Sequence, residues 1–203
     1  MAPFIDALDP GCRLGVCVSP IRVAASGAAG GVGSIMGGGK FGNGAMTGAF
    51  SRLFNEEVAL RAQLSPNGKA NYDVAVKRGY KVVDFDPNAD DVKLHGVTRT
   101  GYTYTRMVAK EIVYARNKGF LLDSGEGVIS PITFFEHELG HIVRTETNPG
   151  SQTVDYLSHQ PGPSGFRNME EFQNVRDNEW PAADFHGDPR RNCYPCGKWV
   201  DYP

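Results

Sequence analysis

The stretch "TFFEHELGHIV" at residues 133 to 143 governs the interpretation of this chain, because it contains the pattern HExxH. In a helix, His137 and His141 lie one turn apart on the same face, so that both imidazoles can reach one metal ion. A helical wheel places an apolar set on nearly the opposite face, namely Phe135, Leu139, Ile142 and Val143. One side of the helix is therefore expected to pack into a core while the other faces a cleft.

The flanking residues set the expected limits of this helix. Ser130 suits the N-cap, and Pro131 suits the first helical position, where its missing N–H does no harm. The apolar pattern then continues to about Thr145, before Pro149 and Gly150 end it.

Glu138, which follows His137 directly, indicates a catalytic function for this motif. Glu138 lies about 80 degrees from the histidine pair on the wheel, where it can act on water beside the metal without binding the ion. Two imidazoles and such a carboxylate are typical of a zinc hydrolase, with Glu138 as general base. The alternative is a pair of ordinary helix histidines, but a random HExxH is expected in only about 0.6% of chains of this composition.

A catalytic zinc site needs a third protein ligand. The candidates downstream are His159, Glu170, Glu171, Asp177, Glu179 and His186. A second helix is expected from Asn168 to about Asn178, and on it Glu171 lies about 100 degrees from the apolar stripe, against about 160 degrees for Glu170. Glu171 is therefore the preferred third ligand. Its alternative role is local, because Asn168 and Glu171 have the spacing of a capping box.

Length and composition restrict the remaining possibilities. A chain of 203 residues suits one domain, or one domain with an appendage. The net charge of -2 and the scattered basic residues argue against nucleic-acid binding. We find no apolar run long enough for a membrane-spanning helix and no standard secretory signal.

The first part of the chain is rich in glycine. Residues 25 to 48 contain ten of the 25 glycines, which favours a flexible linker, with a membrane-perturbing segment as the alternative. We therefore assign residues 1–48 to a linker or delivery segment and residues 49–203 to the enzymatic domain.

The enzymatic domain is expected to be α+β. Its first helix should run from Ala49 to Leu64, and the alternation in residues 72 to 86 predicts a β-hairpin. Residues 106 to 116 fit either a strand or a helix. We expect a loop over residues 151 to 165 and an irregular tail over the last 25 residues.

The four cysteines form two close pairs, Cys12 with Cys17 and Cys193 with Cys196. Three interpretations stay open, which are a four-cysteine zinc site, two disulfides that staple the ends of the chain together, and unlinked thiols.

Three motifs in order carry a family resemblance. "HELGH", then "NMEEFQNV" at 168 to 175, then "DNEW" and "GDPRRNCYP" up to Pro195, resemble the C-terminal half of the NleD-like bacterial effector metallopeptidases, which are injected zincins. The resemblance covers roughly residues 131 to 195. It implies a zincin-like fold, in which a small, mostly antiparallel sheet packs on the HExxH helix and a second helix carries a ligand. It also implies zinc on His137 and His141, Glu138 as base, and the "EE" pair as source of the third ligand, with Glu171 preferred. The sequence departs from the family at Phe172, where a small residue is usual, and in the cysteine pair.

A second resemblance lies upstream. "GGGKFGNGAMTGAFSRLFNEE", residues 37 to 57, is similar to the segment that begins many toxin tips of Rhs and related polymorphic-toxin proteins. It implies a larger Rhs-type carrier, secretion of the type VI kind, delivery into the target-cell cytoplasm, and a cognate immunity protein.

Three functions follow as hypotheses. The first is a zinc endopeptidase toxin that cleaves a target-cell protein held against an edge strand within residues 93 to 105. Five side chains are candidates to stabilise its oxyanion, which are Tyr156, His159, Arg190, Arg191 and Tyr194. The second is a zinc amidase that acts on cell wall, and the third is a non-enzymatic membrane-perturbing or delivery module.

Overall fold

The computed structural model describes residues 20–85, 93–94, 97–98, 103–147, 149–193 and 196–202. The chain divides into two compact units, Met1–Gln63 and Leu64–Pro203, and each is described by itself. The domain border that we predicted at residue 49 lies inside the last helix of the first unit.

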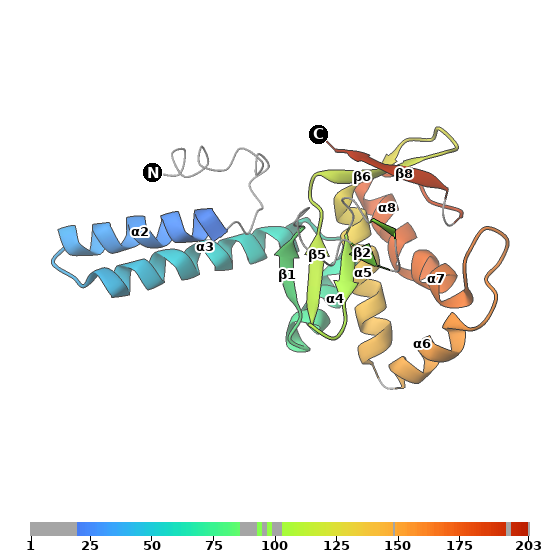
Figure 1. Ribbon diagram of the computed structural model, residues 1–203, viewed down its shortest axis with the longest axis horizontal. Coiled ribbons are helices and arrows are strands. Elements are labelled where there is room, and N and C mark those ends of the chain that lie inside the picture. The colour runs from blue at the N-terminus through green and yellow to red at the C-terminus, as the bar shows by residue number, and fades with distance from the viewer. Residues whose placement is uncertain are drawn as a thin grey trace. The chain divides into compact units, whose positions relative to one another are not determined.

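The described part of the first unit is a pair of helices, α2 (Pro20–Met36) and α3 (Phe41–Gln63), joined by a short turn (Figure 1). A flexible linker over residues 25 to 48 was therefore the wrong expectation for the local structure. The physical reason is visible at Gly30 and Gly44, where a Cβ on either residue would strike the carbonyl oxygen of the other. Small residues thus let the two backbones touch, as they do in closely packed helix pairs. The predicted helix from Ala49 is confirmed and begins earlier, at Phe41.

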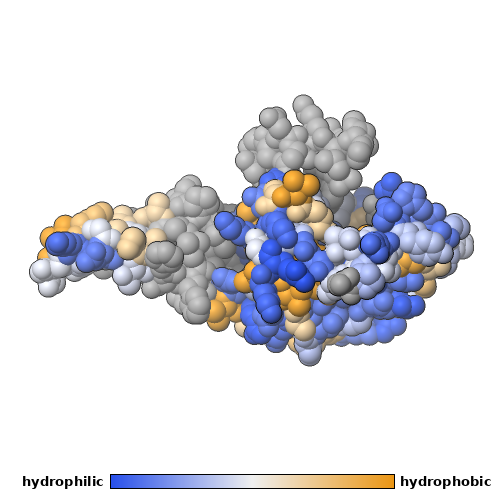
Figure 2. All heavy atoms as spheres, turned by 90° about the horizontal axis from the view of Figure 1, so that it is seen from below, coloured by the Kyte–Doolittle hydropathy of each residue, from blue (hydrophilic) through white to orange (hydrophobic). Residues whose placement is uncertain are grey.

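Apolar side chains are exposed on this hairpin, among them Val32, Ile35, Met36 and Met46. Figure 2 shows the hairpin as a mixture of orange, pale and blue atoms, without a continuous apolar face in this view. Among the described helices, none combines the length and apolarity that crossing a membrane requires.

The second unit is α+β, as predicted. In chain order its elements are α4 (Pro66–Lys77), β1 (Lys81–Asp84), β2 (Lys93–Leu94), β3 (Val97–Thr98), β4 (Tyr104–Arg106), β5 (Glu111–Tyr114), β6 (Lys118–Leu122), β7 (Val128–Ile129), α5 (Pro131–Glu146), α6 (Gly150–Ser158), α7 (Met169–Asn174), the π-helix η2 (Val175–Glu179), α8 (Trp180–His186) and β8 (Gly197–Asp201). One sheet has the order β1-β5-β4, with β1 parallel and β4 antiparallel to β5, and the other is the antiparallel sheet β7-β6-β8. The strands β2 and β3 form a separate antiparallel pair.

The helix α5 is central in this unit (Figure 1). It contacts β4 and β5 on one side and α6, α7, η2 and α8 on the other. Its residues Phe135, Leu139 and Ile142 are fully buried, and the ring of Phe135 lies 4.8 Å from that of Tyr114 and 6.2 Å from that of Tyr72. Each such side chain stabilises the fold by about 1.5–3 kcal/mol through burial. The apolar face predicted for the HExxH helix therefore anchors the core.

The β-hairpin predicted over residues 72 to 86 is wrong in its first half, which forms α4. Ser65 caps this helix by accepting a hydrogen bond from the Gly68 N–H at 3.0 Å, and Pro66 follows at the first helical position. Tyr72 and Ala75 are buried while Val76 is exposed, which is a helical spacing. The alternation of apolar residues at 72 to 76 therefore does not mark a strand.

Three other regions have regular structure where the sequence was ambiguous or predicted a loop or an irregular tail. Residues 111–114 are a strand, α6 occupies the first half of the predicted loop at 151 to 165, and the predicted irregular tail contains α8 and β8. The strand β8 pairs with β6, where Lys118 is opposite Asp201, so its partner lies far away in the sequence. No local pattern could have shown that pairing.

A disulfide joins Cys193 to Cys196, so this pair is closed within itself and does not bridge the ends of the chain. Cys12 and Cys17 lie outside the described residues. Cys196 packs against an apolar cluster of Phe120, Leu122, Ile129 and Phe134.

Candidate metal centre

The helix α5 spans Pro131–Glu146, close to the predicted limits, and Ser130 occupies its N-cap position. The Ser130 side chain does not cap the helix, because it bonds to Asp188 instead. Asp188 accepts hydrogen bonds from the Ser130 N–H at 2.9 Å and from the Thr133 hydroxyl at 2.6 Å. A carboxylate from beyond α8 therefore holds the start of α5, where negative charge also complements the helix dipole.

The two histidines present the same nitrogen to one point. The Nε2 atoms of His137 and His141 lie 3.0 Å apart, and the two rings are nearly perpendicular, at 83°. His137 is buried and His141 is half-buried. The Nε2 atoms of the two imidazoles therefore point toward each other and not into the apolar core.

Glu171 completes a triangle with these two nitrogens. Its Oε2 lies 3.7 Å from His137 Nε2 and 3.4 Å from His141 Nε2. Ligands at about 2.0–2.2 Å from a tetrahedral zinc ion are separated from one another by about 3.3–3.6 Å. The three observed separations, of which the third is the 3.0 Å between the imidazoles, bracket that value. The donor set of two imidazoles and one carboxylate therefore fits a zinc ion in both spacing and chemistry.

The orientation of Glu171 has two causes. Asn168 caps α7 by accepting a hydrogen bond from the Glu171 N–H at 2.8 Å, which fixes the backbone. Arg191 then donates to Glu171 Oε1 at 3.1 Å, which leaves Oε2 facing the histidines. Asn168 thus makes its half of the predicted capping box, because its side chain accepts the hydrogen bond from the Glu171 N–H. The Glu171 carboxylate points to the histidines instead of back to Asn168.

Each histidine has its own carboxylate behind it. The Nδ1 of His141 lies 3.2 Å from Glu170 Oε1, and the Nδ1 of His137 lies 2.9 Å from Glu179 Oε2. The second contact is short but does not have the geometry of a hydrogen bond. Arg191 holds Glu179 with two hydrogen bonds, at 3.0 and 2.6 Å. Such carboxylates behind histidine ligands orient the ring and raise its strength as a donor.

The place of Glu179 could not be found from the wheel. It is the last residue of the π-helix η2, in which each turn holds more residues than in an α-helix. A wheel with 3.6 residues per turn that is continued from α7 therefore gives the wrong direction for the Glu179 side chain. The sequence named Glu179 as one of several possible third ligands, and the structure places it behind His137, on the side away from Glu171.

The site is strongly charged. Burial opposes the charged form of His141, but Glu170 and Glu171 raise the pKa of this imidazole well above its ordinary value. Burial likewise disfavours the Glu171 carboxylate, but His137, His141 and Arg191 bring its pKa well below the usual range. The carboxylates therefore attract positive charge, which a protonated imidazole or a bound divalent cation can supply.

Glu138 lies beside the triangle. It offers an oxygen within 4.8 Å of ligand nitrogens of His137 and His141, and it is half-buried. Thr105 donates a hydrogen bond to Glu138 Oε2 at 2.8 Å. Thr105 belongs to β4, which among the described strands pairs on one side only, with β5. Thr105 is the middle residue of β4 and the last residue of the range 93 to 105, in which we expected an edge strand.

An amide network joins α5 to α7, η2 and α4. The Asn174 side chain is fully buried and donates to the His137 carbonyl oxygen at 2.9 Å, and Asn178 donates to Asn174 Oδ1 at 2.9 Å. Asn178 in turn accepts a hydrogen bond from Asn71 of α4 at 2.9 Å. A Cβ at Gly140 would strike the amides of Asn174 and Asn178. Glycine at this position of HELGH therefore permits the close approach of the two elements.

The remaining third-ligand candidates lie elsewhere. His186 bonds to the buried Glu136 at 2.8 Å, His159 is exposed beside the carbonyl oxygen of Asp155, and Asp177 is exposed beside Arg176.

The oxyanion candidates differ in their surroundings. Arg191 is buried between Glu171 and Glu179, Arg190 is exposed and paired with Asp184, Tyr156 and His159 are exposed on and just after α6, and Tyr194 lies outside the described residues.

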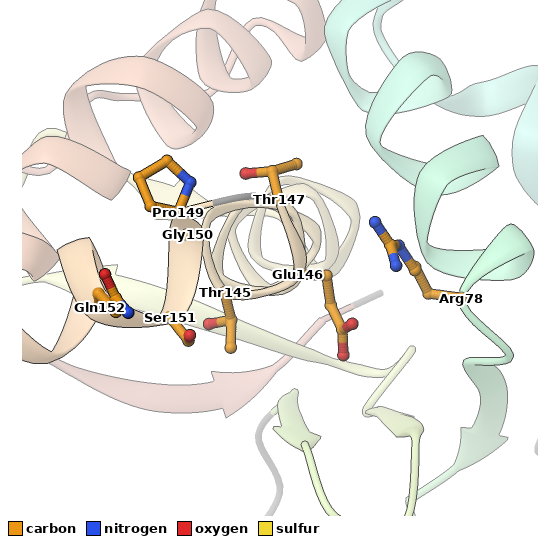
Figure 3. A pocket seen from close by; sticks show the side chains of 8 residues that line it. All are labelled: Arg78, Thr145, Glu146, Thr147, Pro149, Gly150, Ser151 and Gln152. Atoms are coloured by element: carbon orange, nitrogen blue, oxygen red, sulfur yellow. The ribbon is translucent and has the colours of Figure 1, made fainter.

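A polar pocket of about 270 Å³ lies at the C-terminal end of α5, where α6 begins (Figure 3). Arg78 faces Glu146 across it, and neither histidine lines it. It is therefore separate from the metal centre.

Comparisons with known proteins add no identification. No protein-family model matches this chain, and neither the curated proteins nor the solved structures yielded a match. The resemblance to NleD-like peptidases therefore rests on the motifs alone, and function has to be argued from the site.

Proposed function

We propose that this chain is a zinc-dependent endopeptidase. In this proposal His137, His141 and Glu171 hold the ion, and Glu138 is the general base. The observation that carries it is the convergence of His137 Nε2, His141 Nε2 and Glu171 Oε2, separated by 3.0 to 3.7 Å, with the Glu138 carboxylate next to them. Zinc bound there would supply a Lewis acid that polarises the scissile carbonyl.

The residues of the chain itself divide the remaining work. Glu138 takes a proton from the attacking water and passes it to the leaving amine. The Thr105 hydroxyl holds one carboxylate oxygen of Glu138, which leaves the other available for the proton. A purely structural zinc would have no use for a carboxylate in this place.

The substrate is proposed to be a protein segment in extended form. Among the described strands β4 pairs with β5 only, so its other edge can accept an added strand, and its middle residue Thr105 bonds to Glu138. The roles as a secreted toxin, with a target-cell protein as substrate, an Rhs-type carrier and a cognate immunity protein, are proposed on the resemblances of the sequence.

The test is Glu138→Gln, which keeps the shape of the side chain and removes its basicity. We expect this variant to retain stoichiometric zinc and to lose peptidase activity by a factor of about 10²–10⁴. The measurements are zinc content and labelling of new N-termini in a lysate of target cells. Glu126→Gln, at an exposed glutamate in the turn between β6 and β7, is the matched control and should keep both zinc and activity.

Two outcomes would overturn the proposal. A zinc-loaded Glu138→Gln protein with full activity would show that this carboxylate is not the base. Release of muropeptides from peptidoglycan, without new N-termini in the lysate, would favour the amidase hypothesis instead.

A further inference from the structure

Arg144 lies on the same face of α5 as the two histidines, three residues after His141. Its guanidinium contacts two residues of α7 and one residue of η2. Nε lies 3.2 Å from Glu170 Oε1, and Nη2 donates to Gln173 Oε1 at 2.9 Å. A third contact runs from Nη1 to Asp177 at 3.7 Å.

The Glu170 carboxylate links this arginine to a metal-ligand candidate. One oxygen, Oε1, lies 3.2 Å from Arg144 Nε and 3.2 Å from His141 Nδ1. Glu170 is only 6% exposed, so its charge needs compensation from fixed partners. A planar guanidinium that also holds Gln173 restricts where this carboxylate can lie, because its donors have fixed directions.

We propose that Arg144 is a positioning residue for the metal ligand His141, acting through Glu170. This inference rests on the proposed function, because it assumes that His141 binds the ion through Nε2. Arg144 keeps the Glu170 carboxylate on Nδ1, so that Nδ1 carries the hydrogen and the lone pair of Nε2 faces His137 and Glu171. The ligand ring is thereby oriented before the ion arrives.

The effect is specific to one of the two histidines. His137 has a separate pair behind it, Glu179 with Arg191. Loss of Arg144 therefore leaves His137 and Glu171 with their own partners, and only His141 loses its orientation. A lysine at 144 keeps the charge but cannot hold Glu170 and Gln173 at once with fixed geometry.

The experiment compares Arg144→Gln and Arg144→Lys with the matched control Arg116→Gln. Arg116 has a side chain exposed to the same 18% as that of Arg144 and pairs with Asp84 at 2.8 Å, in the β1–β5 sheet. The first measurement is the dissociation constant for zinc alone, by competition with a chromophoric chelator. The second is the melting temperature of the metal-free protein. The third is the long-range ¹H–¹⁵N spectrum of the imidazoles with zinc bound.

The expected result is a zinc dissociation constant about 10–100-fold higher in Arg144→Gln, partial recovery in Arg144→Lys, and no change in Arg116→Gln. The imidazole spectrum should show disturbed Nδ1–H signals for His141 while those of His137 persist. Glu170→Gln, which preserves the packing, should also weaken zinc binding, and it serves as the test should Arg144→Gln fail to fold.

Two results would overturn the inference in different ways. A lower melting temperature of Arg144→Gln with an unchanged zinc dissociation constant would show that Arg144 only docks α5 onto α7. Absence of zinc binding by the wild-type chain would instead remove the proposed function, and this inference with it.

Discussion

Replacement of Gly140 by alanine tests the packing of the metal centre most directly. In an exposed helix, this change normally stabilises by about 0.5–1 kcal/mol, because alanine loses less backbone entropy. In α5, however, the new methyl would strike Asn174 Oδ1 and Asn178 Nδ2 and would lie 2.6 Å from Asn178 Cγ, whereas ordinary contacts begin near 3.4 Å. The neighbouring elements have to move, because the nearest atoms belong to buried, hydrogen-bonded amides.

The magnitude follows from the displacement. Relief of the contact requires α7 and η2 to shift by roughly 1 Å, and such overpacking costs about 1–3 kcal/mol. Weakening of the hydrogen bond from Asn174 to the His137 carbonyl adds about 1 kcal/mol. After subtraction of the gain in helix propensity, Gly140→Ala should destabilise the second unit by about 1–3 kcal/mol. The sign is opposite to that expected from propensity alone.

The same shift should weaken metal binding. Glu171 lies on α7 with Asn174, and metal–ligand distances tolerate deviations of only about 0.2 Å. Displacement of its Oε2 by roughly 1 Å should therefore raise the zinc dissociation constant at least tenfold. The stability and the zinc affinity should change together in this variant.

Urea unfolding followed by tryptophan fluorescence measures the stability. Both tryptophans, Trp180 and Trp199, lie in the second unit, so the signal reports on that unit. A double-mutant cycle with Asn178→Ala removes the amide that the methyl would strike, and the double variant should recover at least 0.5 kcal/mol relative to additivity, roughly the smallest coupling of residues in contact. A Gly140→Ala protein as stable as the wild type, with unchanged zinc affinity, would refute the reasoning.

Two further predictions concern the ends of α5. The hydrogen bond from Lys110 is the main cause that lowers the pKa of Glu146, so this carboxylate stabilises the fold above its ordinary pKa of 4.5 and the contribution is lost as pH falls through the lowered value. The stability advantage of the wild type over Glu146→Gln should thus be largest above pH 5 and should vanish in acid. Because the Lys110–Glu146 pair is half-exposed, this advantage should be less than about 1 kcal/mol and should shrink as salt is added. An advantage that grows in acid contradicts the prediction. At the other end, Asp188→Ala removes the acceptor of the Ser130 N–H and Thr133 hydroxyl and should cost about 1–2 kcal/mol in urea unfolding, whereas an unchanged midpoint would show that water replaces Asp188 at no cost.

Local signals in the sequence were sufficient for the HExxH helix. Its length, its buried face and the shared direction of His137 and His141 follow from a period of 3.6 residues and from the residues at its ends. The preference for Glu171 over Glu170 came from the same wheel, and the structure brings Glu171 Oε2 to the Nε2 atoms while Glu170 lies on Nδ1 of His141. These features depend on neighbours within a few turns of the chain.

Local signals failed where the decisive partner is distant or where two patterns coincide. The apolar alternation at residues 72 to 76 fitted a strand, and the N-cap at Ser65 together with burial against Phe135 made it a helix. The glycine-rich stretch was expected to lack packed structure, but Gly30 and Gly44 bring two helices into backbone contact.

The sequence by itself determined the HExxH helix and the shared direction of its two imidazoles, because helical periodicity is a local property of the chain. Only the tertiary structure decided what lies behind each histidine, namely Arg144 with Glu170 for His141, and Arg191 with Glu179 for His137. The two carboxylates lie at least 29 residues from their histidines in the sequence. Their positions follow from the packing of α7, the wider turn of η2 and the return of the chain after α8, and none of these leaves a periodic trace in the sequence.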